Sequence, residues 1–446
     1  MAGQQTAIYR QMTRLAWRNV LRNWRHSLAT ILAIASGFIA VSLFDGFLEQ
    51  LEYRNKDGYQ TRAMLGHVLV QHKDAQYNST EDQWLYAMTA QEQRFVEDFL
   101  QHDPDFLRRV RFLNISGMVN AGPYNTVFVG LGHDTKEGAE VRGPRWSWYT
   151  VAGVPLEQYP KSSVTIGIAL GKLIDCESTY QGPPYILDAG NYIAEDRPFT
   201  CKYPRITMSA TTEASQVNAI DVPVSGIFDA GFREADKRAV RLSLADAQRL
   251  MDTDKISLLS VELKDERMRK GFIKRLKAAA EAAHLELDIL PWQEHTLAAF
   301  LQGGLDVLHV FRDLFMTIVV TIGIMSVANT MMKAVNERIR EIGTLRSLGF
   351  LRQHLVYMFS MEGLFLSLLA CALGLVGTVV LTVAIGMLKF KYRAGVLSAP
   401  IVLSVAWSWQ AWILCTIVLM SLATGTAWFC SRRASRMVIA DAMRHV

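Results

Sequence analysis

Four long apolar runs without charged residues constrain this chain more than any other feature of its sequence. They lie between His26 and Asp45, between Asp313 and Lys333, between Glu362 and Lys389, and between Arg393 and Arg432, the last being most apolar from Trp409 onward. A helix of about 20 apolar residues crosses a hydrocarbon core roughly 30 Å thick. We therefore expect four transmembrane helices, the first an uncleaved anchor rather than a signal peptide.

Charge is divided unevenly between the runs and the long segment that separates the first two. Residues 45–313 hold 30 of the 47 Lys and Arg and 38 of the 42 Asp and Glu, a net charge of −8. The remaining 17 basic and 4 acidic residues give +13. A separated acidic segment on a basic membrane base does not indicate nucleic-acid binding, and anionic lipids of the inner leaflet better explain the basic part.

The basic residues also predict an orientation. Residues 1–26, 333–361 and 432–446 are rich in arginine and fall on one side of a four-span topology, so that side is expected to be cytoplasmic. The short loop with Lys389, Lys391 and Arg393 would lie on the opposite side and disagrees with this orientation. It contains fewer basic residues than the three arginine-rich segments together. Both termini are therefore expected in the cytoplasm, and the acidic segment on the outer side of the membrane.

The first 26 residues read as an amphipathic helix lying in the membrane interface. Its basic stripe is Arg10, Arg14, Arg18 and Arg22, and Trp17 and Trp24 are expected at headgroup depth. The alternative is a solvated basic tail.

The outer segment mixes strand and helix periodicities, which predicts an α+β domain. Strands are expected at 66–71, 125–132, 164–168 and 221–228, and helices at 91–109, 243–252 and 265–283. A subdomain is plausible across 130–200. The first and second apolar runs continue beyond a membrane's thickness, as stiff stalks or as helix ends packed under the domain.

Several kinds of chemistry are absent from the sequence. No GxxxxGK[ST], HExxH or GxSxG motif occurs, and His67 and His72 are expected to be structural rather than metal ligands. No ionisable residue lies at mid-depth in an expected span, which disfavours ion-driven transport. Cys176 and Cys201 are expected to form a periplasmic disulfide, with two buried thiols as the alternative.

The inner segment between the second and third spans carries the most specific pattern. Spacing alone describes an ordinary inner loop: an alternating-charge helix end, a break at Gly343, a short turn and Gly349 as a helix C-terminal residue. However, the block Glu337-Arg338-x-Arg340-Glu341-Ile342-Gly343-x-Leu345-Arg346-x-Leu348-Gly349 closely resembles the FtsX-like permease domain of the MacB/LolC/LolE superfamily of ABC transporters. SRRASRMVIADAMR echoes that family's closing motif, with Ile439 and Asp441 in place of the usual Pro and Glu.

The resemblance implies a fold, a set of partners and a layout. The fold is a four-helix membrane protein with a large α+β periplasmic domain, similar to the MacB core, inserted between the first and second helices. The expected layout is an interfacial helix at 1–26, a first span with stalk at 27–48, the domain at 49–300, a stalk and second span at 301–334, the coupling segment at 335–361, further spans at 362–388 and 409–431 around a loop at 389–408, and a tail at 432–446.

The resemblance further implies that the chain is not itself an enzyme. A separate cytoplasmic ATPase dimer would bind ATP and Mg²⁺, with the 337–349 segment seated on it as a coupling helix. A second copy or a related permease would complete the transporter, with a periplasmic adaptor or a lipoprotein carrier as a further possible partner. No metal is expected.

Cargo is the least determined expectation. Lipoprotein extraction is favoured, with acyl chains held between the first two spans; efflux of a drug, peptide or siderophore is the alternative, and a non-transporting regulator of a cell-wall hydrolase is the third. The residues expected to line such a cavity are Phe38, Val41, Phe44, Phe315, Val319 and Ile322. Ordinary helix packing is the competing interpretation of each.

Overall fold

The chain folds into two compact units. One comprises Met1–Leu51, Leu305–Phe390 and Leu403–Val446, and the other Glu52–Gly304 and Lys391–Val402. We call them the helical unit and the β domain. The computed structural model describes residues 2–22, 24–78, 82–159, 161–181, 197–337, 344, 346–347, 350–392 and 400–434, with side chains omitted at 2–7, 24–26 and 300–301.

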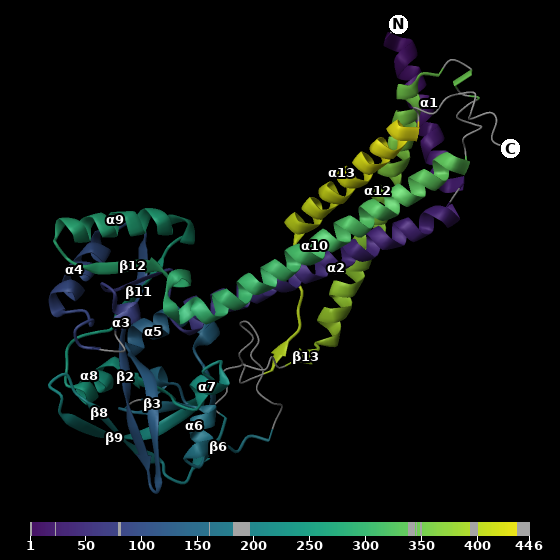
Figure 1. Cartoon of the computed structure of the whole chain (residues 1–446). Helices are drawn as coiled ribbons and strands as arrows, with labels where there is room; N and C mark the ends of the chain where they lie inside the picture. The colour runs from purple at the N-terminus through teal and green to yellow at the C-terminus, as the bar shows by residue number, and fades with distance from the viewer. Residues whose placement is uncertain are drawn as a thin grey trace. The chain divides into compact units, whose positions relative to one another are not determined.

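Among its described residues, the helical unit is built from five long helices (Figure 1): α1 Ala2–Arg22, α2 Trp24–Asp57, α10 Thr296–Glu337, α12 Arg352–Leu388 and α13 Trp409–Ala434. Four of them, α2, α10, α12 and α13, contain windows long and apolar enough to cross a membrane. The four spans expected from the sequence are therefore present as continuous helices. With 34 and 42 residues, α2 and α10 are roughly 51 and 63 Å long, well beyond the hydrocarbon thickness.

The helical unit packs around small residues and branched apolar side chains. All four long helices contribute to one buried cluster, with Phe38 from α2, Val327 from α10, Leu366 from α12 and Leu419 from α13. Helices α12 and α13 approach so closely at Gly363 that an added Cβ would lie 2.5 Å from the Cβ of Ala427. Close backbone approach at small residues is the usual packing mode of membrane helices, where lipid removes the hydrophobic drive for association.

The β domain is built on one ten-stranded mixed sheet. Its strands are β1 Val68–His72, β2 Phe106–Ala121, β3 Tyr124–His133, β4 Thr150–Gly153, β5 Val164–Gly167, β8 Arg205–Thr211, β9 Val217–Phe228, β10 Ala239–Ser243, β11 Leu258–Leu263 and β12 Leu287–Pro291. Six of them, β2, β3, β10, β5, β9 and β8, pair in a closed circuit that returns to β2. Closure leaves no free edge in this circuit, which encloses buried Val119, Phe128 and Met208.

The remaining strands extend this circuit. Strands β11, β1 and β12 continue from β2, and β4 pairs with β9. The segment in which a subdomain was expected, 130–200, contributes β4 and β5 to this same sheet. Lys391–Tyr392 and Ile401–Val402 form a separate two-stranded sheet, β13 and β14.

Helices of the β domain cover the sheet (Figure 1): α3 Ala75–Asn78, α4 Ala90–His102, α5 Thr135–Arg142, α6 Ile168–Leu173, α7 Arg233–Asp236, α8 Leu244–Met251 and α9 Arg269–Ala282. Short helical turns occupy Gly58–Arg62, Pro144–Trp146, Leu156–Gln158, Glu266–Met268 and Trp292–Glu294. Helix α4 starts with a capping box between Thr89 and Glu92, which satisfies two backbone donors at its first turn.

One predicted helix extends too far toward its C-terminal end. The expected helix at 91–109 ends at His102, and β2 begins at Phe106. The reason is Pro104, because a residue before proline is pushed out of the helical region, and Asp103 has φ −83° and ψ 125°.

Cys176 and Cys201 are joined by a disulfide. They stand opposite each other at the ends of β6 Cys176–Ser178 and β7 Phe199–Cys201, which pair with each other as a small antiparallel sheet. The bridge therefore fixes the two ends of a segment whose middle, 182–196, lies outside the described residues.

The glycine packing predicts opposite effects for two alanine substitutions. Gly363→Ala should lower stability by roughly 1–3 kcal/mol, because the new Cβ has no room beside Ala427. Gly425→Ala, inside α13 with nothing within 4 Å of its Cβ position, should be neutral or stabilise by up to about 1 kcal/mol. Thermal unfolding of the purified protein in detergent measures both, and equal shifts for the two variants would contradict this packing.

Candidate functional site

Helix α1 is held in the helical unit by an apolar stripe that the sequence pattern does not single out. Met12, Ala16 and Val20 recur every four residues and are all buried. Met12 and Ala16 belong to a cluster completed by Val335 of α10 and by Met358 and Phe359 of α12. The helix therefore packs on protein along one face, and is more than a solvated tail.

Polar contacts reinforce the joint between α1 and α12. The Asn19 amide donates to Glu362 Oε1 at 2.6 Å, and the hydroxyls of Thr13 and Tyr357 lie 3.1 Å apart. Glu362 is only 3% exposed. The apolar run in the sequence places this carboxylate at the edge of the third span, but α12 begins at Arg352, so Glu362 lies inside the helix.

The predicted interfacial residues of α1 fall on its exposed side. Arg10, Arg14, Arg18 and Arg22 are all exposed, and the Trp17 ring meets that of Phe365 edge-on at 5.2 Å. The Trp24 side chain lies outside the described residues. Exposed Leu15 and Leu21 lie on either side of the arginine stripe. Contact of this side with lipid remains a prediction.

The six predicted cargo-cavity residues are placed in different surroundings. Phe38 and Val41 are buried in the helix-packing cluster, and Val319 faces Gly37 so closely that a Cβ there would clash. The Phe44 and Phe315 rings meet at 5.9 Å, while Phe315 and Ile322 are each about half exposed. Helix packing thus accounts for three of the six, and a cargo-binding role stays a prediction.

Most of the predicted coupling helix, residues 337–349, lies outside the described residues, including Arg338, Arg340, Glu341, Ile342, Gly343, Leu345, Leu348 and Gly349. Its first residue, Glu337, ends α10 and lies 3.9 Å from Lys333. Arg346 is described as helical. The side chains proposed to face a partner are therefore assigned from the sequence alone.

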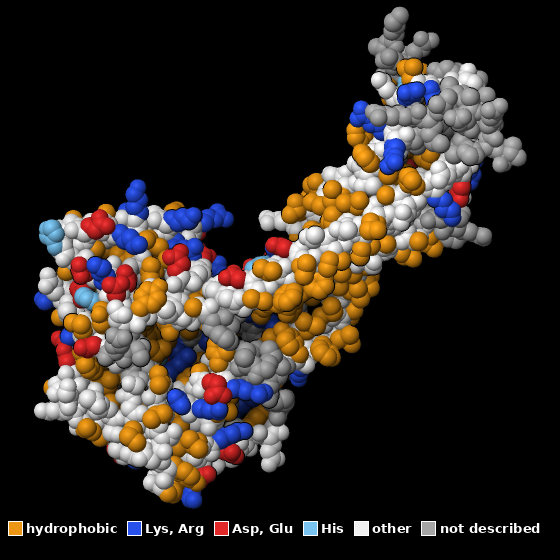
Figure 2. Space-filling model, in the orientation of Figure 1, with side chains coloured by type: hydrophobic (Ala, Val, Ile, Leu, Met, Phe, Trp, Pro, Cys, Tyr) orange, Lys and Arg blue, Asp and Glu red, His pale blue; other side chains and the backbone are white. Residues whose placement is uncertain are grey.

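The exposed surface of the helical unit is largely apolar. Figure 2 shows hydrophobic side chains along the visible face of its helices, and Lys and Arg near the end where the N-terminus lies. Exposed Leu314, Val376 and Ile417 belong to three different long helices. Apolar surface of this extent on long helices is expected where lipid replaces water as the solvent.

Inside the β domain a charge cluster is buried that the sequence does not reveal. Arg142 forms a short ion pair with Glu157, and its guanidinium centre lies 3.9 Å from the centre of the Tyr149 ring. His133 Nε2 lies 2.9 Å from Glu157 Oε1. Arg241 stacks over the same tyrosine ring at 5.0 Å. The Glu157 carboxylate thus contacts the buried Arg142 and His133, and the half-buried Arg241 joins the cluster through the Tyr149 ring.

The protonation of this cluster follows from its burial. Burial by itself would raise the pKa of Glu157, but Arg142 and the His133 hydrogen bond outweigh it and bring the pKa to about 2. Burial lowers the pKa of His133, which is neutral at neutral pH. Burial and the neighbouring Arg142 lower the pKa of Arg241 to about 10, so it remains charged.

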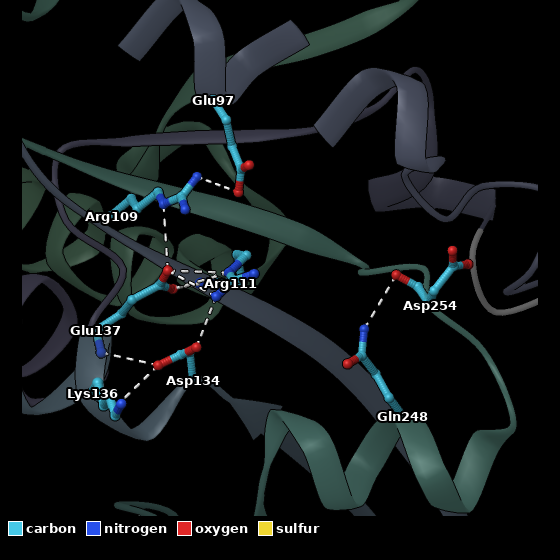
Figure 3. Close-up of polar contacts among 8 residues, drawn as sticks. All are labelled: Glu97, Arg109, Arg111, Asp134, Lys136, Glu137, Gln248 and Asp254. Carbon is cyan, nitrogen blue, oxygen red and sulfur yellow. Dashed lines mark hydrogen bonds and ion pairs between the residues drawn. The ribbon is translucent and has the colours of Figure 1, made fainter. Parts of the chain in front are cut away.

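A second network lies at the surface where α4, β2 and α5 meet (Figure 3). Arg109 pairs with Glu97 and, at 3.4 Å, with Glu137; Arg111 pairs with Glu137 at 3.0 Å and with Asp134 at 2.8 Å. Asp134 also caps α5 through the backbone amides of residues 136 and 137. These contacts order the domain surface, with no catalytic arrangement among them.

His67 and His72 take part in hydrogen bonds within the fold. His67 Nδ1 accepts from the Leu263 amide at 3.0 Å, and His72 Nδ1 lies 2.8 Å from Glu92 Oε1. Within the ranges that the structure covers, no group of three or more potential ligands is placed to hold a metal ion.

Comparisons with known proteins find relatives of part of the helical unit. Residues 314–439 match the family model described as FtsX-like permease C-terminal. The chain is 22% identical over 159 residues to the lipoprotein-releasing system transmembrane protein LolC of Xylella fastidiosa strains 9a5c and Temecula1, matching 36% of this chain and 37% of each relative. The match thus spans little more than a third of the curated relatives.

Two solved structures are similar over half of this chain. One is the extracellular domain of the noncanonic ABC-type transporter YknZ from Gram-positive bacteria, with a TM-score of 0.30, 10% identity and all of that chain covered. The other is the periplasmic region of MacB from Actinobacillus actinomycetemcomitans, with a TM-score of 0.32, 9% identity and 88% of that chain covered.

The fold and the matched segment define a class: a membrane protein with four transmembrane helices and a large β-rich domain between the first and second. Within that class, residues 314–439 are similar to the FtsX-like permease C-terminal family, and the chain resembles LolC over about a third of its length.

The buried charge cluster predicts a large loss of stability on removal of its carboxylate. Glu157→Ala would leave Arg142 buried without its anion and should cost about 3–5 kcal/mol. Because the folded pKa of Glu157 lies below its unfolded value of 4.5, its contribution is complete above pH 4.5 and is lost as the pH falls toward 2.

Thermal unfolding of the full chain in detergent between pH 7 and pH 3 tests this expectation. Glu234→Ala, which removes an exposed carboxylate paired with Lys237, is the matched control and should change stability little. A loss for Glu157→Ala no greater than that of the control would contradict the role assigned to the cluster.

Proposed function

We propose that this chain is the permease subunit of an inner-membrane ABC transporter that works by mechanical transmission. A separate cytoplasmic ATPase would hydrolyse ATP, and the chain would convert that work into movement of a periplasmic domain. The match of residues 314–439 to the FtsX-like permease family carries this proposal, because it spans the second to fourth long helices and the segment between α10 and α12.

The length of α10 supports transmission along a rigid element. It runs without interruption from Thr296 to Glu337, where the proposed coupling segment begins. A continuous helix moves as a stiff rod, so a displacement imposed at Glu337 reaches residues roughly 60 Å away. A flexible linker would dissipate such a displacement.

The chemistry of ATP hydrolysis is assigned to the partner. The sequence contains no GxxxxGK[ST] loop to cradle phosphates, so ATP and Mg²⁺ would bind to the ATPase. The transporter would contain two permeases, either two copies of this chain or this chain with a related one. Both termini and residues 337–349 would face the cytoplasm, consistent with the arginine-rich flanks.

Lipoproteins are the cargo we favour, because both curated relatives are named as transmembrane proteins of a lipoprotein-releasing system. The half-exposed Phe315 and Ile322 on α10 would offer apolar surface to an acyl chain. The second candidate is efflux of a drug, peptide or siderophore through an adaptor, and the likeness to the periplasmic region of MacB does not decide between the two. Regulation of a cell-wall hydrolase is the third.

Charge introduced into the coupling segment should uncouple the ATPase. Leu345→Glu with Leu348→Glu replaces the two apolar residues expected to seat in the partner, and a buried unpaired carboxylate is costly. We expect the tagged variant to insert into the membrane normally. The amount of ATPase that co-purifies with it should fall at least tenfold.

The matched control is Leu107→Glu with Val217→Glu, which places two carboxylates at exposed positions of the β domain. This variant should retain the ATPase at the wild-type level. Retention by the Leu345/Leu348 variant as well would refute the coupling assignment.

A further inference from the structure

Three large aromatic side chains are exposed at the end of the helical unit where α12 ends and α13 begins. Phe390 follows the last turn of α12 and is 63% exposed, while Trp407 and Trp409 are 45% and 61% exposed. A fourth ring, Trp412, is buried, and its centre lies 5.8 Å from that of Trp407 and 5.0 Å from that of Trp409. The two exposed indoles are therefore held in place by packing. We call Phe390, Trp407 and Trp409 the aromatic collar.

Backbone hydrogen bonds tie the aromatic collar to α12 and α2. The Leu403 amide donates to the Phe390 carbonyl at 2.7 Å, so the segment before α13 runs beside the end of α12. The Ala406 amide donates to the Gly46 carbonyl of α2 at 2.9 Å. Glycine permits this close approach, because an added Cβ at Gly46 would lie 2.6 Å from the Ala406 oxygen. The collar is thus part of the helix bundle.

The aromatic collar lies at the level where the apolar runs of α2 and α10 end. Asp45, next to Gly46, closes the run of α2, and Asp313 opens that of α10. Arg312 Nη1 lies 3.5 Å from Asp45 Oδ1, which places these two charged ends side by side. From Asp313 to Lys333, the next charged residue of α10, the helix rises about 30 Å, the thickness of a hydrocarbon core. The collar therefore marks one boundary of the apolar part of the bundle.

We propose that the aromatic collar contacts the glycerol and ester groups of phospholipids, in the headgroup layer of the leaflet from which α2 and α10 continue into the β domain. Tryptophan favours that layer because its ring is apolar and its N–H is wet. Lipid is the partner rather than a second copy of this chain, because exposed apolar residues continue from the collar along α13, at Ile413, Leu414 and Ile417, into a span that a bilayer covers. The collar requires membrane insertion only and is independent of the proposed ATPase coupling.

Tryptophan fluorescence of the full chain in phosphatidylcholine vesicles tests the proposal, with bromine quenchers on the acyl chains either near the headgroup or near the chain end. The emission lost in Trp407→Phe with Trp409→Phe isolates the two collar indoles from the other tryptophans. That signal should be quenched roughly twofold or more strongly by the shallow bromine than by the deep one. Phe390→Trp adds an indole to the collar and should show the same preference, which makes the test independent of the double variant.

Two controls calibrate the depth. Val376→Trp adds an indole at an exposed position midway between Glu362 and Lys389 of α12, and should be quenched more strongly by the deep bromine. Trp84→Phe with Trp292→Phe removes two indoles of the β domain, whose signal neither lipid should quench. Collar indoles quenched by neither lipid, as in water or beneath a second copy of the chain, would overturn the proposal. Stronger quenching of the collar by the deep bromine would overturn it as well.

Discussion

The hydrocarbon core of a bilayer contains no water to satisfy a backbone amide, and the rest of this structure depends on that constraint. Every residue that crosses must lie in a helix with its hydrogen bonds closed internally, which the four long helices achieve. Since lipid removes the hydrophobic drive for association, these helices are held by close contacts such as Gly363 against Ala427. The buried carboxylate of Glu362 finds its partner there in the side-chain amide of Asn19.

The β domain solves the opposite problem, because water competes for each of its polar groups. Its six-strand circuit removes free edges and buries a continuous apolar core. It also buries Arg142 against the Glu157 carboxylate, an arrangement that contributes little stability overall but makes removal of either member costly.

The features predicted from the sequence are those with a strong local signal. The four spans follow from uninterrupted apolar runs, and strands such as β3 and β9 from alternating residues between turns. The predicted helix at 91–109 runs too far because the apolar spacing of α4 continues into β2 and masks the single proline that separates them. The Met12, Ala16 and Val20 stripe escapes prediction because Ala16 and the single Met12 are weak signals beside four arginines.

Features made by distant residues could not be predicted. Arg142, Glu157 and Arg241 look like ordinary surface charges in the sequence and form a cluster only where α5, the turn Leu156–Gln158 and β10 meet. The coupling segment is the reverse case: its motif is specific in sequence, and its role is inferred from the family.

The central claim is that a separate ATPase acts on residues 337–349 from the side of the membrane opposite the β domain. Impermeant maleimide labelling of spheroplasts tests it, using Val217→Cys and Ser347→Cys separately in a chain whose free Cys371, Cys415 and Cys430 are replaced by serine. The account predicts immediate labelling at 217 and labelling at 347 only after the membrane is permeabilised. Labelling of both positions in intact spheroplasts would contradict it.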